Sequence, residues 1–180
     1  TVKVAIAGAS GRMGRMLIEA ALQMPEVVFS AALDRADSPF IGRDAGELVG
    51  NACGVTIASD VEAALSVPDC LIDFTRPEGT LKHLRVARRL KCSVVIGTTG
   101  FTPEGRALIG EAAREIPVMF ASNMSVVVNA VFKLLDIAAK ILASGYDVEV
   151  FEAHHRFKVD EPSGTALSMG EVVAKALDRD

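Results

Sequence analysis

Histidines and a lysine crowd together near the end of this sequence. His154 and His155 precede Lys158 by a few positions, just before a predicted helix start. Lys158 supplies positive charge, and the backbone amides of Gly164 and Thr165 supply directed hydrogen-bond donors. A histidine beside them can deliver a proton at neutral pH. This combination favours a receptor for a substrate that carries carboxylates.

A metal site and a purely structural role are the alternatives for the same histidines. Adjacent residues of a strand point to opposite sides, so His154 and His155 are poor joint ligands. No cysteine, aspartate or glutamate completes a usual metal-binding spacing with them. A single histidine would favour a structural role, but two histidines and a lysine within five positions favour a functional site. We therefore expect no metal.

The second chemical signal is a glycine-rich turn near the start of the chain. Gly8, Gly11 and Gly14 follow an apolar strand-like run and open a helical pattern. Gly8 would allow a tight turn, Gly11 a close approach to a ligand, and Gly14 close packing of helix on strand. The turn is therefore predicted to bind the pyrophosphate of a dinucleotide at the helix amino end. The candidate residues are Gly8, Ala9, Ser10, Gly11, Arg12, Met13 and Gly14.

An acidic residue lies where the ribose of such a cofactor is expected. Asp34 ends the second apolar run, 20 residues after Gly14, which is the usual place for an acid that binds the ribose hydroxyls. The alternative, a glycine-rich turn with an incidental acid, fits the strand, turn and helix context poorly. Arg35 and Arg12 could meet a 2′-phosphate, so both NADH and NADPH remain possible cofactors.

Further polar loops follow later strands of the predicted sheet. Ligands of a doubly wound sheet bind at the carboxyl ends of its strands, and hydroxyls there can hydrogen-bond a nicotinamide and its ribose. Ordinary turn chemistry is the alternative explanation. The candidate residues are Phe74, Thr75, Gly97, Thr98 and Thr99, with Asn123 and Ser125 after the sixth strand.

A parallel sheet is needed to bring these loops together. From Val2 to about Ala121, short β-rich runs alternate with helical patterns, as in a sheet covered on both faces. We expect strands at Val2–Ala7, Val27–Leu33, Val55–Ile57, Cys70–Phe74, Val94–Ile96 and Val118–Ala121. Helix starts are expected at the capping boxes Ser59 with Glu62 and Thr75 with Glu78, and at Thr102-Pro103.

The pattern changes after residue 121. Val126–Ser144 predicts one long amphipathic helix, Asp147–Ala153 alternates like a strand, and a last helix is expected over Gly164–Leu177. We place a domain boundary near residue 125. The fold class is α/β: a Rossmann-like doubly wound parallel sheet in residues 1–125, followed in 126–180 by the start of an α+β substrate domain.

Composition narrows the possible partners. The chain has 180 residues, half of them hydrophobic, and a formal net charge of −4, which argues against nucleic acid and acidic membranes. No apolar run approaches the roughly 20 residues needed to cross a bilayer. Cys53, Cys70 and Cys92 are too few and too widely spaced for a disulfide framework. We expect a cytoplasmic protein with reduced thiols.

Taken together, the motifs resemble the family of 4-hydroxy-tetrahydrodipicolinate reductases (dihydrodipicolinate reductases), and the resemblance spans the whole sequence. It is carried by the segments 8–14, 73–78 (DFTRPE), 97–101 (GTTGF), 152–155 (EAHH) with Lys158, and 162–166 (PSGTA). The resemblance implies an NAD(P)H-dependent oxidoreductase that reduces an unsaturated cyclic dicarboxylate to tetrahydrodipicolinate in diaminopimelate and lysine biosynthesis. It also implies a homotetramer.

The resemblance implies roles for individual residues as well. His154 is the implied general acid, and Lys158 assists proton donation and substrate binding. The carboxylates of the substrate are implied to contact His155, Lys158, Ser163, Gly164 and Thr165, with Thr99 nearby. The implied cofactor residues extend the sets above with Ala121, Ser122, Asn123 and Met124.

Several departures from the family pattern bear on these roles. Phe157 stands where another histidine is frequent, Glu161 where alanine is usual, and Val127 where glycine is expected. A negative charge at Glu161 would weaken the binding of a dianion unless it faces solvent. Members of the family also continue beyond residue 180, so we expect residues 1–180 alone to be unstable or inactive.

Two other functions remain open at this point. The first is a non-catalytic nucleotide-binding module on the same fold, which would bind the cofactor without the dicarboxylate. The second is a different dehydrogenase, but the only tyrosine, Tyr146, has Val150 four residues later. That spacing lacks the lysine of the Tyr-x-x-x-Lys arrangement of short-chain dehydrogenases.

Overall fold

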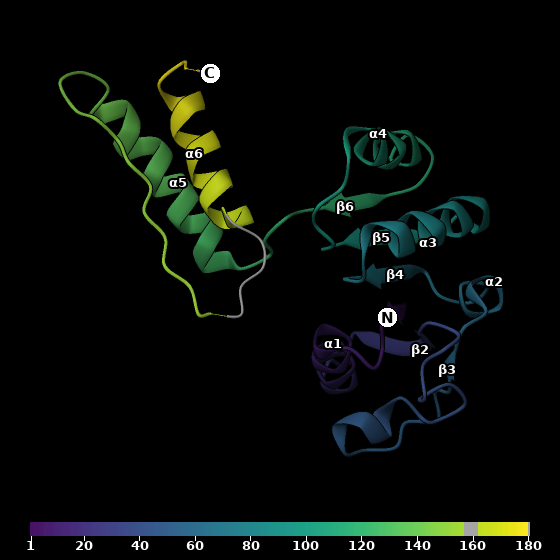
Figure 1. The fold of residues 1–180 in the computed structure, drawn as a ribbon. Coiled ribbons are helices and arrows are strands. Elements are labelled where there is room, and N and C mark those ends of the chain that lie inside the picture. Colours follow the sequence, from purple (N-terminus) through teal and green to yellow (C-terminus); the bar gives the residue numbers. More distant parts are fainter. Residues whose placement is uncertain (157–161, 180) are drawn as a thin grey trace. The chain divides into compact units, whose positions relative to one another are not determined.

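A six-stranded parallel sheet organises the first part of the chain in the computed structural model, which describes residues 1–156 and 162–179 (Figure 1). The strand order is β3-β2-β1-β4-β5-β6, so the order reverses between β1 and β4, as in a doubly wound fold. The predicted Rossmann-like class is confirmed. The strands are β1 (Val2–Ala7), β2 (Val27–Leu33), β3 (Ile57–Ala58), β4 (Cys70–Asp73), β5 (Ser93–Ile96) and β6 (Val118–Phe120).

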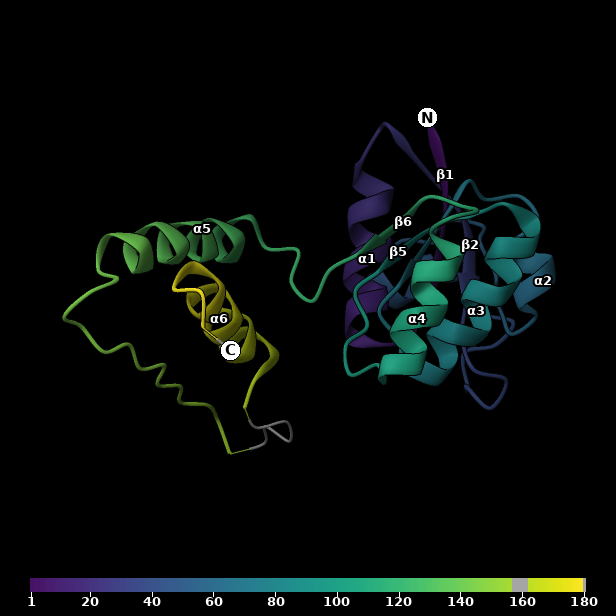
Figure 2. The ribbon, with the colours of Figure 1, turned by 90° about the horizontal axis from the view of Figure 1, so that it is seen from above.

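Helices cover both faces of this sheet (Figure 2). Their bounds are α1 (Arg12–Gln23), α2 (Val61–Ala64), α3 (Pro77–Leu90) and α4 (Pro103–Ala112), with a short 3₁₀ turn, η1, at Gly46–Val49. Alternate residues of β1 serve the two faces, because successive side chains of a strand point to opposite sides. Val4 and Ile6 pack with Ile18 of α1, whereas Ala5 and Ala7 belong to the core under α2, α3 and α4.

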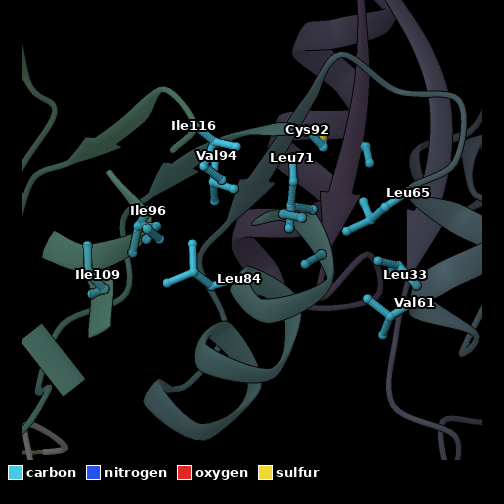
Figure 3. Close-up of a cluster of buried hydrophobic side chains, with 14 of the residues drawn as sticks. Leu33, Val61, Leu65, Leu71, Leu84, Cys92, Val94, Ile96, Ile109 and Ile116 are labelled. Carbon is cyan, nitrogen blue, oxygen red and sulfur yellow. The ribbon is translucent and has the colours of Figure 1, made fainter. Parts of the chain in front are cut away.

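The core under α2, α3 and α4 is the larger of the two and contains most of the buried leucines and isoleucines (Figure 3). Leu71 and Ile96 of the sheet are fully buried there, and Leu84 of α3 and Ile109 of α4 close over them. Burying each such side chain contributes roughly 1.5–3 kcal/mol of transfer free energy. This core holds the carboxyl ends of β4 and β5 rigidly beneath the loops that follow them.

The helix starts differ from the predicted capping boxes at two of three places. Asp60, and not Ser59, caps α2, because its Oδ1 accepts hydrogen bonds from the amides of Glu62 and Ala63 at 3.0 and 3.1 Å. Thr75 caps no helix, since its hydroxyl donates to Asp73 and α3 begins at Pro77. Thr102 caps α4 as predicted, accepting from the Gly105 amide at 3.2 Å.

Strand β3 is shorter than predicted: it begins two residues later and ends one residue later than Val55–Ile57. Only Ile57 and Ala58 pair with β2. Thr56 instead forms an isolated antiparallel bridge with Asp44. The pairing changes there because the loop that leads into β3 folds back on itself.

Residues 121–180 form a separate compact unit. Within it, α5 (Val126–Ile141) and α6 (Gly164–Ala176) pack against each other (Figure 1). The predicted strand at Asp147–Ala153 is wrong for the structure described, because those residues form no ladder with another described segment. Phe151 in that stretch is 93% exposed. An alternating pattern becomes a strand only when a partner supplies the hydrogen bonds.

The two compact units meet at the bond between Phe120 and Ala121. The predicted domain boundary near residue 125 lies a few residues later, in the segment that leads into α5. Across the described residues, the structure contains no helix that is both long and apolar enough to span a membrane. Cys53, Cys70 and Cys92 are free thiols, and burial raises the pKa of Cys92 to about 11.

Candidate functional site

The glycine-rich turn between β1 and α1 has the tight geometry that a pyrophosphate site requires. Gly8 adopts a left-handed conformation with φ +68°, which favours glycine. A Cβ on Gly14 would lie 2.1 Å from the carbonyl oxygen of Gly8, so only glycine lets α1 begin so close to the turn. The amides of Ala9 and Gly11 donate to the carbonyls of Leu33 and Gly8, so a dinucleotide phosphate would bind the first amides of α1, which the glycines let it approach.

Asp34 joins the end of β2 to this turn. Its Oδ2 accepts a hydrogen bond from the Ser10 amide at 3.0 Å, and its Oδ1 accepts from the Arg35 amide at 2.8 Å. The carboxylate is only partly buried, so it can also accept hydrogen bonds from the hydroxyls of a ribose. The Arg35 side chain is exposed and pairs with Asp37 at 3.4 Å, and Arg12 is also exposed.

The loops after β4 and β5 pack on each other. A Cβ on Gly97 would lie 2.0 Å from the ring of Phe74, so the ring rests directly on the glycine backbone. Thr98 is 4% exposed and its Oγ1 lies 2.8 Å from Oγ1 of Thr80. Its hydroxyl is thus engaged inside the protein, whereas Thr99 is exposed. Of the two threonines, only Thr99 offers its side chain to a ligand.

Asp73 and His83 also belong to this region, although residue type and spacing alone predicted no role for either. Asp73 is fully buried at the end of β4, and Nδ1 of His83 lies 2.7 Å from its Oδ2. Burial opposes ionisation, but hydrogen bonds from His83 and Thr75 outweigh it and hold the pKa of Asp73 below its ordinary value. A carboxylate that ends an apolar run is a weak signal, and only the fold shows what it contacts.

In the second unit, Glu152 ties His154 to the start of α6. The two oxygens of Glu152 make different contacts: Oε2 lies 2.7 Å from Nε2 of His154, and Oε1 accepts from the Ser163 amide at 2.9 Å. Hydrogen bonds from Ser163, and then from His154, lower the pKa of Glu152 to about 2. The sequence analysis gave Glu152 no role, although it stands two residues before His154.

Ser163 also begins α6, because its Oγ accepts from the Ala166 amide at 3.0 Å. The amides of Gly164 and Thr165 occupy the first turn of that helix. Among the described residues, no atom lies within 4 Å of the position that a Cβ on Gly164 would take. Ser163, Gly164 and Thr165 thus lie together at the amino end of α6, and His155 lies on the segment before it; their role as a carboxylate receptor stays a prediction.

Part of the predicted site cannot be placed. Lys158 lies outside the described residues, as do Phe157 and Glu161, two of the departures from the family pattern. The third departure, Val127, is in the first turn of α5 and is 72% exposed. Within residues 1–156 and 162–179, no three histidine, cysteine or acidic side chains are arranged to hold a metal.

The predicted residues before α5 shape the start of that helix. Oδ1 of Asn123 accepts from the Ser125 amide at 2.8 Å, and Oγ of Ser125 caps the helix by accepting from Val128. The Asn129 amide group closes the turn by donating to the Asn123 carbonyl at 3.1 Å. Ala121, Ser122 and Met124 lie in the same stretch.

Comparison with known proteins covers both units. Residues 2–124 match the family model of the dihydrodipicolinate reductase N-terminus, and residues 127–180 match that of the C-terminus. The 4-hydroxy-tetrahydrodipicolinate reductases of Cupriavidus pinatubonensis and Aromatoleum aromaticum are 64% and 63% identical over 179 residues, which is 99% of this chain. The chain covers 68% and 65% of those two proteins, so it spans about two thirds of their length.

Solved structures also match this chain. The dipicolinate-bound dihydrodipicolinate reductase from Paenisporosarcina sp. TG-14 matches with a TM-score of 0.77 and 27% identity, over 98% of this chain and 66% of that one. GenD2 from gentamicin A biosynthesis, solved in complex with NAD, has a TM-score of 0.54 at 18% identity, over 80% of this chain and 39% of that one. The second match shows the fold alone.

Proposed function

Since this chain belongs to the dihydrodipicolinate reductase family, we propose that it reduces 4-hydroxy-tetrahydrodipicolinate to tetrahydrodipicolinate. Enzymes of this family are NAD(P)H-dependent oxidoreductases of diaminopimelate and lysine biosynthesis. NADH or NADPH supplies the hydride when bound. The observation that carries the proposal is that Glu152 holds His154 beside the amino end of α6, within a chain that matches both family models.

Most contacts of the cofactor are assigned to the first unit, and the others to residues 121–124 at the start of the second unit. The amides at the amino end of α1 would hold the pyrophosphate, and the glycines of the turn from Gly8 to Gly14 would let it come close. Asp34 would accept hydrogen bonds from the adenosine ribose. Arg12 and Arg35 would bind the 2′-phosphate of NADPH. The remaining proposed contacts of the cofactor are Phe74, Thr75, Gly97, Thr98 through its backbone, Thr99, Ala121, Ser122, Asn123 and Met124.

His154 is assigned the proton transfer. Because the pKa of Glu152 is about 2, this carboxylate is ionised at neutral pH and can only accept hydrogen bonds. The hydrogen in the Glu152–His154 contact therefore belongs to Nε2 of His154, and the imidazolium form of His154 would give its second proton from Nδ1 and remain as a neutral ring. Hydride addition to the unsaturated ring leaves negative charge, and the proton from His154 neutralises it at the adjacent ring position.

The substrate carboxylates are assigned to the amino end of α6. The amides of Gly164 and Thr165 supply donors at the positive end of the helix dipole. Ser163, His155 and Lys158 complete the proposed receptor, and Lys158 also assists the proton transfer. Thr99 is proposed to contact the substrate from the first unit. A homotetramer and a cytoplasmic location complete the proposal.

Oxidation of the reduced cofactor, followed by absorbance after addition of the unsaturated cyclic dicarboxylate, tests this function. His154→Ala and Lys158→Ala should lose turnover while NADH binding persists. The matched control is Lys133→Ala, on the exposed side of α5. Calorimetry that detects cofactor binding but no pyridine-dicarboxylate binding would support a non-catalytic nucleotide-binding module instead.

A further inference from the structure

Asp73 is a buried carboxylate that the proposed reaction does not use. It ends β4, pairs with Ala7 of β1 in the sheet, and has no exposed surface. β1 and β4 flank the point where the strand order reverses, which is where ligands of this fold bind. An ionised group in such a place is costly unless several donors satisfy it, so its contacts indicate what it does.

One oxygen of Asp73 holds the loop after β4. Oδ1 accepts from the amide of Thr75 at 2.9 Å and from its hydroxyl at 2.6 Å. The methyl group of Thr75 in turn lies against the glycine-rich turn, because a Cβ on Gly8 would be 3.0 Å from Thr75 Cγ2. Asp73 thus supports the pyrophosphate turn through one intervening residue.

The same oxygen also reaches the loop after β5. Thr80 donates its hydroxyl to Oδ1 at 3.0 Å, and the Thr80 and Thr98 hydroxyls are 2.8 Å apart. The backbone carbonyl of Asp73 accepts from the Gly97 amide at 2.9 Å. The two loops with candidate nicotinamide contacts and the glycine-rich turn therefore converge on one buried carboxylate.

His83 satisfies the other oxygen. It projects from α3, its side chain is 14% exposed, and its Nδ1 lies 2.7 Å from Oδ2 of Asp73. Without this donor, Oδ2 would be a buried anionic oxygen with no partner, and rearrangement of the threonines around Asp73 would follow. His83 is therefore the group that keeps the hydroxyls of Thr75, Thr80 and Thr98 in a single arrangement.

We propose that Asp73 and His83 are positioning residues for the nicotinamide cofactor: they fix the loops after β4 and β5 against the glycine-rich turn. This proposal rests on the cofactor use assigned above. Neither residue touches the reacting atoms. Their effect is to preorganise the loops, and the misplacement of such contacts by a fraction of an ångström weakens binding and orientation.

The test compares His83→Leu with His83→Asn. Asparagine places an amide nitrogen near the position of Nδ1 and so retains the donor, whereas leucine removes it. The dissociation constant for NADH is measured by fluorescence titration without substrate, and KM for each substrate is measured in turnover. Ile109→Val, in the core beneath α4 and away from Asp73, is the control for a general loss of stability.

We expect His83→Leu to raise the Kd and KM for NADH about tenfold, the equivalent of one charge-assisted hydrogen bond. KM for the dicarboxylate should stay the same, and His83→Asn should restore NADH affinity. If His83→Leu does not fold, Thr80→Val takes its place in the test. This substitution removes one hydroxyl at nearly constant shape and should also weaken NADH binding.

Equal NADH affinity in His83→Leu and Ile109→Val would overturn the proposal, as would equal weakening by leucine and asparagine at position 83. If His83→Leu does not fold, unchanged NADH affinity in Thr80→Val would also overturn the proposal. NADH binding is measured without the dicarboxylate, so it tests the positioning role separately from the proposed reaction. Either one can fail while the other is supported.

Discussion

Oε2 of Glu152 lies 2.7 Å from Nε2 of His154, while the other oxygen of Glu152 binds the backbone at the start of α6. One carboxylate therefore sets both the orientation of the proposed proton donor and its attachment to the helix that is assigned the substrate carboxylates.

Replacement of Glu152 by glutamine should lower turnover without weakening the cofactor. Glutamine can still accept from the Ser163 amide, but it no longer presents an anion to His154. We expect kcat to fall about tenfold or more, as part of the contribution of a general acid is lost, and KM for NADH to stay unchanged. Steady-state kinetics across pH 5–9, with Glu149→Gln in the same segment as the control, measures both. A normal kcat in Glu152→Gln would exclude the orienting role.

A methyl group at Gly14 should separate α1 from the glycine-rich turn. In Gly14→Ala the added carbon would lie 2.1 Å from the Gly8 oxygen and 2.8 Å from the Ala9 Cα, both backbone atoms that cannot move aside. We expect a loss of about 2 kcal/mol of stability from overpacking, together with loss of NADH binding. Chemical denaturation and calorimetry measure the two effects.

Gly110→Ala is the matched control for that substitution. Gly110 is also helical, but a Cβ there would meet nothing within 4 Å. Alanine should therefore stabilise α4 by about 0.5–1 kcal/mol. A Gly14→Ala protein as stable as Gly110→Ala would contradict the close packing described for the turn.

Asp34 should favour NADH over NADPH, because a carboxylate accepts from ribose hydroxyls and repels a 2′-phosphate. We expect Asp34→Asn to weaken NADH about tenfold, the equivalent of one hydrogen bond that involves a charged group, and to weaken NADPH less. Arg35→Ala should affect NADPH alone. Dissociation constants for both cofactors in both variants decide this, and a parallel loss for the two cofactors in Asp34→Asn would contradict it.

Asp44 should make the stability of the first unit depend on pH in the acid range. Hydrogen bonds from the amides of Cys53, Gly54 and Gly46 outweigh burial and lower the pKa of Asp44 from 3.8 to about 2. A pKa that is lower in the folded state means that the ionised form is stabilised by folding. The contribution is complete above about pH 4 and is lost as the pH falls toward 2.

Thermal unfolding between pH 2 and pH 6 measures that contribution. Asp44→Asn should lower Tm at pH 6 and flatten its dependence on pH in the acid range. Asp37→Asn, in the exposed turn after Asp34, is the control and should leave the slope unchanged. Identical slopes for the parent protein and Asp44→Asn would show that Asp44 is not the group responsible.

Sequence patterns predicted the elements correctly where the stabilising interactions lie between residues that are close in the chain. β1 and β2 match their predicted bounds because each is a run of β-forming residues that ends at a glycine or an acid. Thr102 and Pro103 specify the start of α4 through one hydrogen bond and one fixed φ angle. The glycine spacing likewise predicts the turn, since only residues without a Cβ allow that approach.

Other predictions were wrong because the folded chain offered a different hydrogen-bond partner, or none among the described residues, at the predicted place. Asp60 lies one residue after Ser59 and is an equally good cap, and only the path of the chain decides between them. Thr75 has the spacing of a capping box, but its hydroxyl donates to the carboxylate of Asp73 at 2.6 Å. Asp147–Ala153 alternates like a strand, but it forms no ladder with another described segment.

The fold class, the glycine-rich turn and the family could be predicted from residue types alone, because each depends on short, constant separations along the chain. Only the tertiary structure showed that the hydroxyl of Thr98 is engaged in the interior, and that Asp73 is a buried acceptor for residues up to 25 positions away. Which polar groups satisfy one another is decided by the packing of separate elements, since a buried charge takes whichever donors the fold brings within reach.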